Sequence, residues 1–201
     1  MAERAAPYRA LHVDFGTGDG AFVRAVAARN PDTLVIGVDA NADALRATSR
    51  RFAAKPSRGG VANALLGRLP LADAPGELAG LADALTVLLP WGSLLAAVAR
   101  PEPSALRALR ALCKEHAEIR VVLGYGPATE GAMIRDLGLP ALDAPGALAE
   151  LECVYRSAGL AVHARAAHTD EIRALPTTWA KRLAFSGHER RYVELHGRVL
   201  R

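Results

Sequence analysis

The 201-residue sequence has few cysteines, few aromatic residues and no long apolar run. Its two cysteines, Cys113 and Cys153, stand far apart, so neither a disulfide framework nor a metal site is expected. No stretch approaches the ~18 apolar residues of a membrane-spanning helix. The first ten residues, MAERAAPYRA, lack the apolar core of an export signal. These absences predict a cytoplasmic globular protein with no membrane partner.

Acidic residues are missing from one long segment. Between Ala44 and Ala72 there are six basic residues and no acid, and between Thr177 and Arg201 there are six basic residues against two acids. The chain carries a formal charge of +4, so these segments, at +6 and +4, leave −6 for the remainder. Such segregation favours a polyanion such as nucleic acid as the partner, although solvated helix faces would give the same pattern.

Short apolar segments alternate with segments of helical periodicity. This order predicts one α/β domain over residues 1–201, with about seven strands in a mostly parallel sheet covered by helices on both faces. Since no helix is apparent between the last two strands, an antiparallel strand is expected near the end. Strands are predicted at Leu11–Phe15, Thr33–Asp39, Ala64–Leu69, Ala84–Leu89, Ile119–Gly126, Ala161–His168 and Arg191–Leu200, and helices at Gly20–Asn30, Ala42–Ala54, Pro103–His116 and Asp143–Ala158.

The sequence HVDFGTGDG joins the first predicted strand to the first predicted helix. In a parallel sheet, ligands bind where strands end, so this loop is the expected site. Gly16 and Gly18 would allow a tight turn and a close approach of ligand to backbone. Asp39 ends the second strand, where its carboxylate could accept both hydroxyls of a ribose.

Two ligands fit this loop. Gly16-x-Gly18-x-x-Ala21 followed by Asp39 matches a dinucleotide fingerprint, and a nicotinamide-dependent oxidoreductase is therefore one alternative. A dinucleotide would place its pyrophosphate on the loop, where Asp14 would repel it. S-adenosylmethionine has no phosphate, and Asp14 would attract its ammonium and its sulfonium. The charge favours S-adenosylmethionine as the cofactor.

The two tryptophans each lie beyond an apolar run. Trp91 follows the fourth predicted strand in LLPWGSLL, and Trp179 precedes the last strand in LPTTWAKRL. Both could be packing residues. A pair at the ligand edge could instead hold an extruded base, because stacking contributes ~1–3 kcal/mol per base. Leu88–Trp91 lacks the acid or amide with which methylases align an exocyclic amine, and this favours a ring nitrogen as the methyl acceptor.

Several segments resemble one family. HVDFGTGDG, IGVDAN, KPSRGG, LADAPGELAGLAD, LLPWGSLL, GLPAL and TTWAKRLAFSG resemble the aminoglycoside-resistance methyltransferases of the kanamycin–apramycin type, which modify N1 of a decoding-site adenine in 16S ribosomal RNA. The combination of LPWG with TTWAKRLAF is the specific part of this resemblance. It implies a Rossmann-like class I S-adenosylmethionine-dependent fold. It also implies that a monomer methylates adenine 1408 in the assembled small (30S) ribosomal subunit.

The resemblance also implies roles for individual residues. S-adenosylmethionine would contact Asp14, Gly16, Gly18, Asp39, Leu71, Ala72, Leu88, Leu89 and Pro90. Trp91 and Trp179 would stack on the target adenine, Thr177 would line the site, and Arg182 and Arg191 would contact the flipped nucleotide. The RNA-docking residues would be Arg50, Arg51, Lys55, Arg58, Lys181 and Arg190. A methyltransferase for another RNA or for a small molecule, and a non-catalytic RNA-binding module, are the remaining alternatives.

Overall fold

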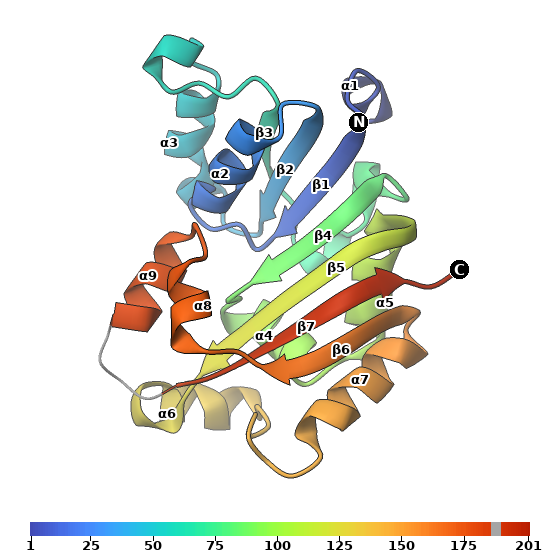
Figure 1. The fold of residues 1–201 in the computed structure, drawn as a ribbon, viewed down its shortest axis with the longest axis vertical. Coiled ribbons are helices and arrows are strands. Elements are labelled where there is room, and N and C mark those ends of the chain that lie inside the picture. The colour runs from blue at the N-terminus through green and yellow to red at the C-terminus, as the bar shows by residue number, and fades with distance from the viewer. Residues whose placement is uncertain (186–189) are drawn as a thin grey trace.

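The computed structural model describes residues 1–185 and 190–201 (Figure 1). These residues form a seven-stranded sheet in the order β3-β2-β1-β4-β5-β7-β6. β1, β2, β3, β4 and β5 are parallel, whereas β7 pairs antiparallel with both β5 and β6. The strands are β1 (Ala10–Phe15), β2 (Thr33–Asp39), β3 (Ala64–Arg68), β4 (Ala82–Leu88), β5 (Cys113–Tyr125), β6 (Leu160–Ala166) and β7 (Arg191–Val199). The predicted Rossmann-like α/β fold, with an antiparallel last strand, is confirmed.

Helices cover both faces of the sheet. On one face, α2, α8 and α9 share a buried cluster in which Phe22, Ile172 and Leu183 pack on Leu88 and Val122. On the other face, α4, α5 and α7 pack on the sheet in the largest cluster. The helices are α1 (Ala2–Ala5), α2 (Ala21–Arg29), α3 (Ala42–Phe52), α4 (Gly92–Ala99), α5 (Pro103–Leu112), α6 (Pro127–Leu137), α7 (Ala147–Ser157), α8 (Thr169–Arg173) and α9 (Thr178–Phe185), with short 3₁₀ turns η1 (Pro56–Arg58), η2 (Leu71–Asp73) and η3 (Gly76–Leu78).

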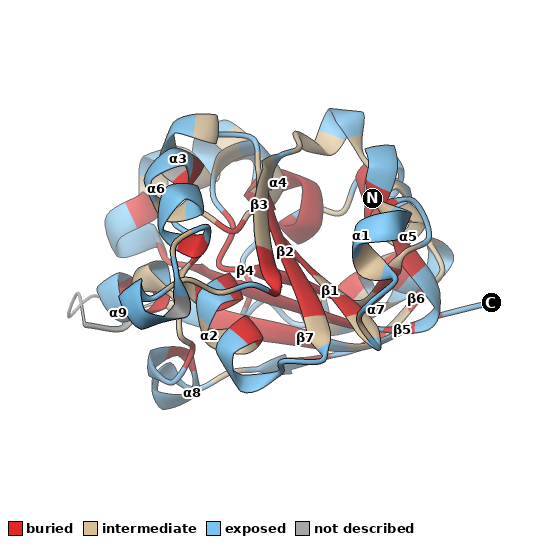
Figure 2. Ribbon diagram, turned by 90° about the horizontal axis from the view of Figure 1, so that it is seen from above, coloured by how far each residue is buried: buried red, intermediate tan, exposed pale blue. Residues whose placement is uncertain are grey.

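The central strands are buried from both sides, as Figure 2 shows. Val13, Val35, Leu85 and Val121 are almost inaccessible to solvent. Continuous apolar strands of this kind occur in parallel sheets with helices on both faces. β1, β2, β4 and β5 end at one edge of the sheet, which we call the carboxyl edge, and α8 and α9 lie there (Figure 1). Within the described residues no helix has the length and apolar character that a bilayer crossing needs.

Three expectations need correction. No helix is predicted between the last two strands, but the connection between β6 and β7 contains α8 and α9. The antiparallel direction of β7 therefore does not come from the absence of a helix. α5 ends at Leu112, and the segment from Cys113 to His116 belongs to β5 instead of to a helix. α4 was not predicted, because its residues Leu95–Ala99 are buried all round and give no amphipathic period.

Candidate functional site

A cavity of about 890 Å³ lies at the carboxyl edge. Its size falls within the ~300–1,000 Å³ of small-molecule and cofactor sites. The ends of β1, β2, β3 and β4 contribute loops to its wall, and the start of α5 closes another side. The wall includes Gly16, Gly18, Asp39, Leu69, Pro70, Leu71, Ala72, Leu89, Pro90, Trp91, Leu94, Glu102 and Trp179.

The glycine loop (Gly16–Gly20) folds against β2. The backbone N–H groups of Gly16 and Thr17 donate to the carbonyl of Val38 at 2.8 and 3.0 Å. Gly16 has φ +80°, and a Cβ there would lie 2.5 Å from a methyl group of Leu94. Gly18 has φ +58°, and a Cβ there would meet no atom within 4 Å. The loop therefore presents bare backbone to the cavity at Gly18, as a closely bound ligand requires.

Asp39 connects this loop to β2. Its Oδ2 accepts a hydrogen bond from the Gly18 N–H at 2.9 Å, and its Oδ1 accepts one from the Asn41 N–H at 2.9 Å. A carboxylate has about four acceptor positions, so both oxygens can accept further donors from the cavity. The arrangement can bind two neighbouring hydroxyl groups, as a ribose would offer.

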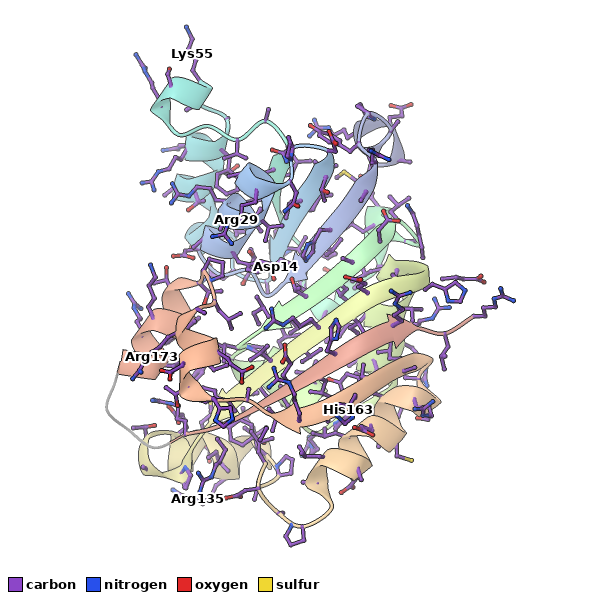
Figure 3. All side chains as sticks on the ribbon, viewed as in Figure 1. Asp14, Arg29, Lys55, Arg135, His163 and Arg173 are labelled. Carbon is purple, nitrogen blue, oxygen red and sulfur yellow. The ribbon has the colours of Figure 1, made fainter. Side chains whose placement is uncertain are left out.

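Asp14 lies beneath the loop and not on the cavity wall (Figure 3). Asp14 is 3% exposed, and its Oδ1 accepts a hydrogen bond from the Thr86 hydroxyl at 2.7 Å. Burial raises the pKa of Asp14 to about 6; the Thr86 hydrogen bond opposes this rise and the charge of Asp39 adds to it. The sequence predicts Asp14 directly against the ligand. The structure instead buries Asp14 behind the cavity wall, with its carboxylate bonded to Thr86.

The two tryptophans come together at the cavity. Their ring centroids are 5.8 Å apart and their planes meet at 17°. Both side chains are unusually open for tryptophan, with Trp91 48% and Trp179 41% exposed. A base stacked at ~3.4 Å on each ring would need planes about 7 Å apart, and since the plane separation cannot exceed the centroid distance, the rings would have to separate by at least roughly 1 Å. The pair is therefore aligned for stacking, although its gap is too narrow for a base.

Local structure fixes both tryptophans. Leu89 directly follows β4 with φ +50°, a left-handed conformation that costs a non-glycine residue ~1–3 kcal/mol, and its N–H donates to the Val122 carbonyl at 2.8 Å. Pro90 and Trp91 follow this turn. On the other side, the Thr177 hydroxyl accepts from the Ala180 N–H at 2.8 Å and caps α9, which carries Trp179.

Some predicted cofactor and base contacts lie elsewhere. Leu88 is buried in the cluster beneath α8 and α9, and it is Leu89 and Pro90 that reach the cavity. Thr177 caps its helix instead of lining the wall. Arg182 places its guanidinium 5.8 Å from the ring centroid of Trp179, so the structure brings it to the tryptophan pair. Ser186 and Gly187, the end of the TTWAKRLAFSG motif, lie outside the described residues.

Arg190 and Arg191 are not brought to the cavity. The side chain of Arg190 is only 5% exposed, and its Nη2 lies 2.6 Å from Oε1 of Glu130 in α6. It also donates to the carbonyl of Leu183 at 3.3 Å, near the end of α9. Arg191 pairs with Asp143 at 3.2 Å. A buried guanidinium that holds two helices together is not available to dock RNA, so Arg190 is better described as structural.

The other basic residues form an exposed surface. Arg50 and Arg51 are exposed on α3, Lys55 between α3 and η1, Arg58 on η1, and Lys181 on α9. Asn41 fixes the start of α3 by accepting from the Asp43 N–H at 3.0 Å. Figure 3 shows Lys55 at the far tip of this region and Arg29 on α2 below it. Arg24 and Arg29, both exposed on α2, lie outside the two segments that the charge pattern singles out.

Comparisons with known proteins agree with one another. A family model described as "NpmA: 16S rRNA (adenine(1408)-N(1))-methyltransferase" matches residues 1–198. A 16S rRNA (adenine(1408)-N(1))-methyltransferase of Escherichia coli is 31% identical over 191 residues, which cover 94% of this chain and 87% of the relative.

Two solved structures have a similar fold. The aminoglycoside resistance methyltransferase NpmB1 superposes with a TM-score of 0.82 at 39% identity, over 98% of this chain and 91% of that one. A mutant of the 16S rRNA (adenine(1408)-N(1))-methyltransferase from Catenulisporales acidiphilia, solved with its cosubstrate SAM, superposes with a TM-score of 0.85 at 31% identity. It covers all of this chain and 90% of that one.

Proposed function

The chain belongs to the 16S rRNA (adenine(1408)-N(1))-methyltransferase family, and we propose that the cavity at its carboxyl edge carries out that reaction with S-adenosylmethionine as the methyl donor. The acceptor is N1 of the adenine, and the substrate is the assembled 30S subunit. A methyl group there would block an edge that aminoglycosides contact and would add positive charge, so the product should confer resistance.

The cavity suits S-adenosylmethionine. Gly18 offers open backbone, Asp39 can accept the ribose hydroxyls, and Leu71 and Ala72 give an apolar wall for the adenine ring. Asp14 and Asp39 make the region negative, as an ammonium and a sulfonium prefer and a diphosphate does not. When bound, this cofactor supplies an electrophilic methyl group. The comparisons give no support to the nicotinamide alternative.

The tryptophan pair would hold the target base. Trp91 and Trp179 would part and receive the extruded adenine, and Arg182, beside Trp179, would meet the phosphate or sugar of that nucleotide. Adenine N1 has an in-plane lone pair, so it needs no general base. Alignment with the methyl group can supply most of the rate, because good orientation contributes on the order of 7–11 kcal/mol. The ring faces would also favour the cationic product.

The exposed basic residues of α3, η1 and α9 would position the enzyme on the subunit. Arg50, Arg51, Lys55, Arg58 and Lys181 have the exposure that contacts to phosphates need. Phosphate contacts set orientation without reading sequence, so recognition would depend on the shape of the assembled subunit. We propose a monomer that acts in the cytoplasm, where this substrate is found.

The stacked tryptophan pair at the cavity is the main observation behind this proposal. The proposed methyl transfer can be tested directly. Purified 30S subunits are incubated with the protein and S-adenosylmethionine, and the 16S rRNA is then read by reverse transcriptase. If the protein is this enzyme, the reverse transcriptase should stop at adenine 1408, because N1-methyladenine cannot pair. The stop should be much weaker when naked rRNA is the substrate. The absence of a stop on the subunits would refute the proposed function.

Replacing either tryptophan should slow methylation strongly while the cofactor still binds. Trp91→Ala or Trp179→Ala loses a stacking surface worth ~1–3 kcal/mol, so the rate should fall about 5- to 150-fold. Trp91→Phe and Trp179→Phe serve as matched controls that keep an aromatic face, and they should retain most activity. Full activity in both alanine variants would show that the pair does not hold the base.

A further inference from the structure

One hydrogen bond joins the glycine loop to the helix that carries Trp179. The hydroxyl of Thr178, at the start of α9, donates to Oδ2 of Asp19 at 2.5 Å. The two residues are 159 positions apart in the chain. The other carboxylate oxygen, Oδ1, accepts from the Ala21 N–H at 3.1 Å, so Asp19 is held at the start of α2. The hydrogen bond therefore connects the start of α2 to the start of α9.

The chain neighbours of these two residues belong to the two halves of the site. Gly18, next to Asp19, lines the cavity and donates to Asp39. Trp179, next to Thr178, lines the same cavity and stacks on Trp91. A shift of the glycine loop by a few tenths of an ångström would thus be passed to the tryptophan pair through one hydrogen bond.

The tryptophan pair has to move when it takes a base. Its rings stand at least about 1 Å too close for a stacked adenine between them. Trp179 is on α9, whose other end is held by Arg190 through the Leu183 carbonyl. The start of the helix, at Thr178, is held by the glycine loop. The state of that loop can therefore bias whether the pair is open or closed.

We propose that the Asp19–Thr178 hydrogen bond couples cofactor binding to capture of the target base, so that Asp19 and Thr178 are positioning residues for the methyl transfer. This inference rests on the proposed function. A ligand in the cavity fixes the glycine loop, the loop fixes the start of α9, and Trp179 is then set for the base. Because coupling is reciprocal, a bound subunit must tighten the cofactor by the same factor.

The test measures this factor directly. The Kd for purified 30S subunits is determined with and without saturating S-adenosylhomocysteine, the demethylated form of the cofactor, which prevents turnover. We expect the cofactor product to tighten subunit binding by at least about 5-fold in the unmodified protein. Thr178→Val, which removes only the hydroxyl, should reduce this ratio to below about 2-fold. Thr178→Ser keeps the hydroxyl and should restore it.

A merely structural role would give a different result. If Thr178→Val weakened the fold or the RNA surface, both Kd values would rise together and their ratio would stay at the unmodified value. Asp19→Ala should reduce the ratio of the two Kd values as Thr178→Val does. The double variant should reduce this ratio no further, because each single variant already breaks the hydrogen bond. Thr169→Val removes an exposed hydroxyl on α8 and is the matched control that should keep the unmodified ratio.

Failure of this inference is distinguishable from failure of the proposed function. A reverse-transcriptase stop at adenine 1408, together with a ratio near one in the unmodified protein or an unchanged ratio in Thr178→Val, would overturn the coupling and leave the enzyme activity intact. Absence of the stop would overturn the activity itself.

Discussion

Two buried carboxylates near the carboxyl edge differ in how the protein treats them. Asp14, beneath the glycine loop, is 3% exposed, and Glu130, in α6, is 7% exposed. Asp14 accepts from a neutral hydroxyl, that of Thr86. Glu130 accepts from the guanidinium of Arg190 at 2.6 Å and from the Gly126 N–H at 3.0 Å. The burial of the two groups is alike, but their partners are not.

Their acidities differ accordingly. Burial raises the pKa of Asp14 to about 6. Burial alone would also raise the pKa of Glu130, but its hydrogen bonds from Arg190, Thr129 and Gly126 hold that pKa below the usual value. His12, which lies 3.1 Å from the Thr86 hydroxyl, adds no positive charge near pH 7, because burial lowers the pKa of His12 to about 4.

The difference separates a structural carboxylate from a functional one. Glu130 has its cation within the fold, so it joins α6, α9 and the start of β7 into one unit. Asp14 keeps a negative charge that its neighbours do not neutralise, beside a cavity whose proposed ligand is a cation. Strongly perturbed groups of this kind concentrate at functional sites, where a protein accepts a local cost in stability.

The largest expected effect comes from breaking the compensated pair. Glu130→Gln removes the carboxylate charge beside the buried guanidinium of Arg190, and the free energy of unfolding should fall by roughly 3–5 kcal/mol at pH 7. Because the folded pKa of Glu130 is lowered, its stabilisation exists above the usual pKa of about 4.5 and is lost as the pH falls through the folded value. Urea unfolding at pH 7 and at pH 3.5 should show the deficit shrinking in acid.

A double variant tests whether charge compensation is the cause. Glu130→Leu combined with Arg190→Met replaces the pair by apolar groups of similar size and should recover much of the lost stability. If Glu130→Gln costs less than about 1 kcal/mol, or if the double variant is worse than the single one, the ion pair does not hold this junction together.

The second effect is smaller and has the opposite sign. Asp14→Asn removes a charge that burial disfavours and should raise the free energy of unfolding at pH 7–8, on the order of 2 kcal/mol. A folded pKa near 6 means that the cost is present above pH 6 and disappears as the pH falls toward 4, so the advantage of the variant should vanish there. Chemical unfolding between pH 4 and pH 8 measures this dependence.

The same variant should bind the cofactor less well. Calorimetric titration with S-adenosylmethionine should give a weaker Kd for Asp14→Asn at pH 7.5, and the affinity of the unmodified protein should decline below pH 6 toward that of the variant. A variant that is destabilised at pH 7 and binds the cofactor normally would instead place Asp14 in the same class as Glu130.

The contrast also shows what the sequence can and cannot reveal. β2 occupies Thr33–Asp39 as predicted, because an apolar run bounded by polar residues needs no tertiary information. The meeting of Trp91 and Trp179 could be predicted from strand order, since both were expected near strand ends at one edge. The sequence predicts helix at the start of β5, because the polar residues Lys114–His116 continue the preceding helical pattern and nothing local indicates that Cys113 pairs with Ala82 of β4.

The burial and the partners of charged side chains could not be predicted from the sequence. Arg190 stands among other basic residues and looked like a docking residue, and nothing local indicates that Glu130, 60 positions earlier, covers it. Asp14 looked like a ligand contact, but in a strand buried on both faces the alternation of side chains does not tell which one reaches the cavity. In both cases the position of the side chain depends on tertiary packing and not on the residue type.

Replacing exposed basic residues should have the smallest effect on stability. These residues provide the comparison with the buried carboxylates Asp14 and Glu130. Arg50, Arg51, Lys55 and Arg58 are exposed along the segment from α3 to η1, so replacing each by alanine should change the free energy of unfolding by no more than about 0.5 kcal/mol. Each substitution should nevertheless weaken 30S binding, and the slope of log K against log salt should flatten by about 1 for every phosphate that the variant no longer neutralises.

Arg198→Ala is the matched control for this series. Arg198 is 68% exposed near the opposite end of the sheet, 3.9 Å from Glu118, and its replacement should alter neither stability nor the salt dependence. If the α3 variants and Arg198→Ala bind subunits equally well, the basic segment is only a solvated helix face. If the α3 variants alone flatten the slope, exposed charge acts on the partner at no cost to the fold, whereas the buried charges of Asp14 and Glu130 act on the fold itself.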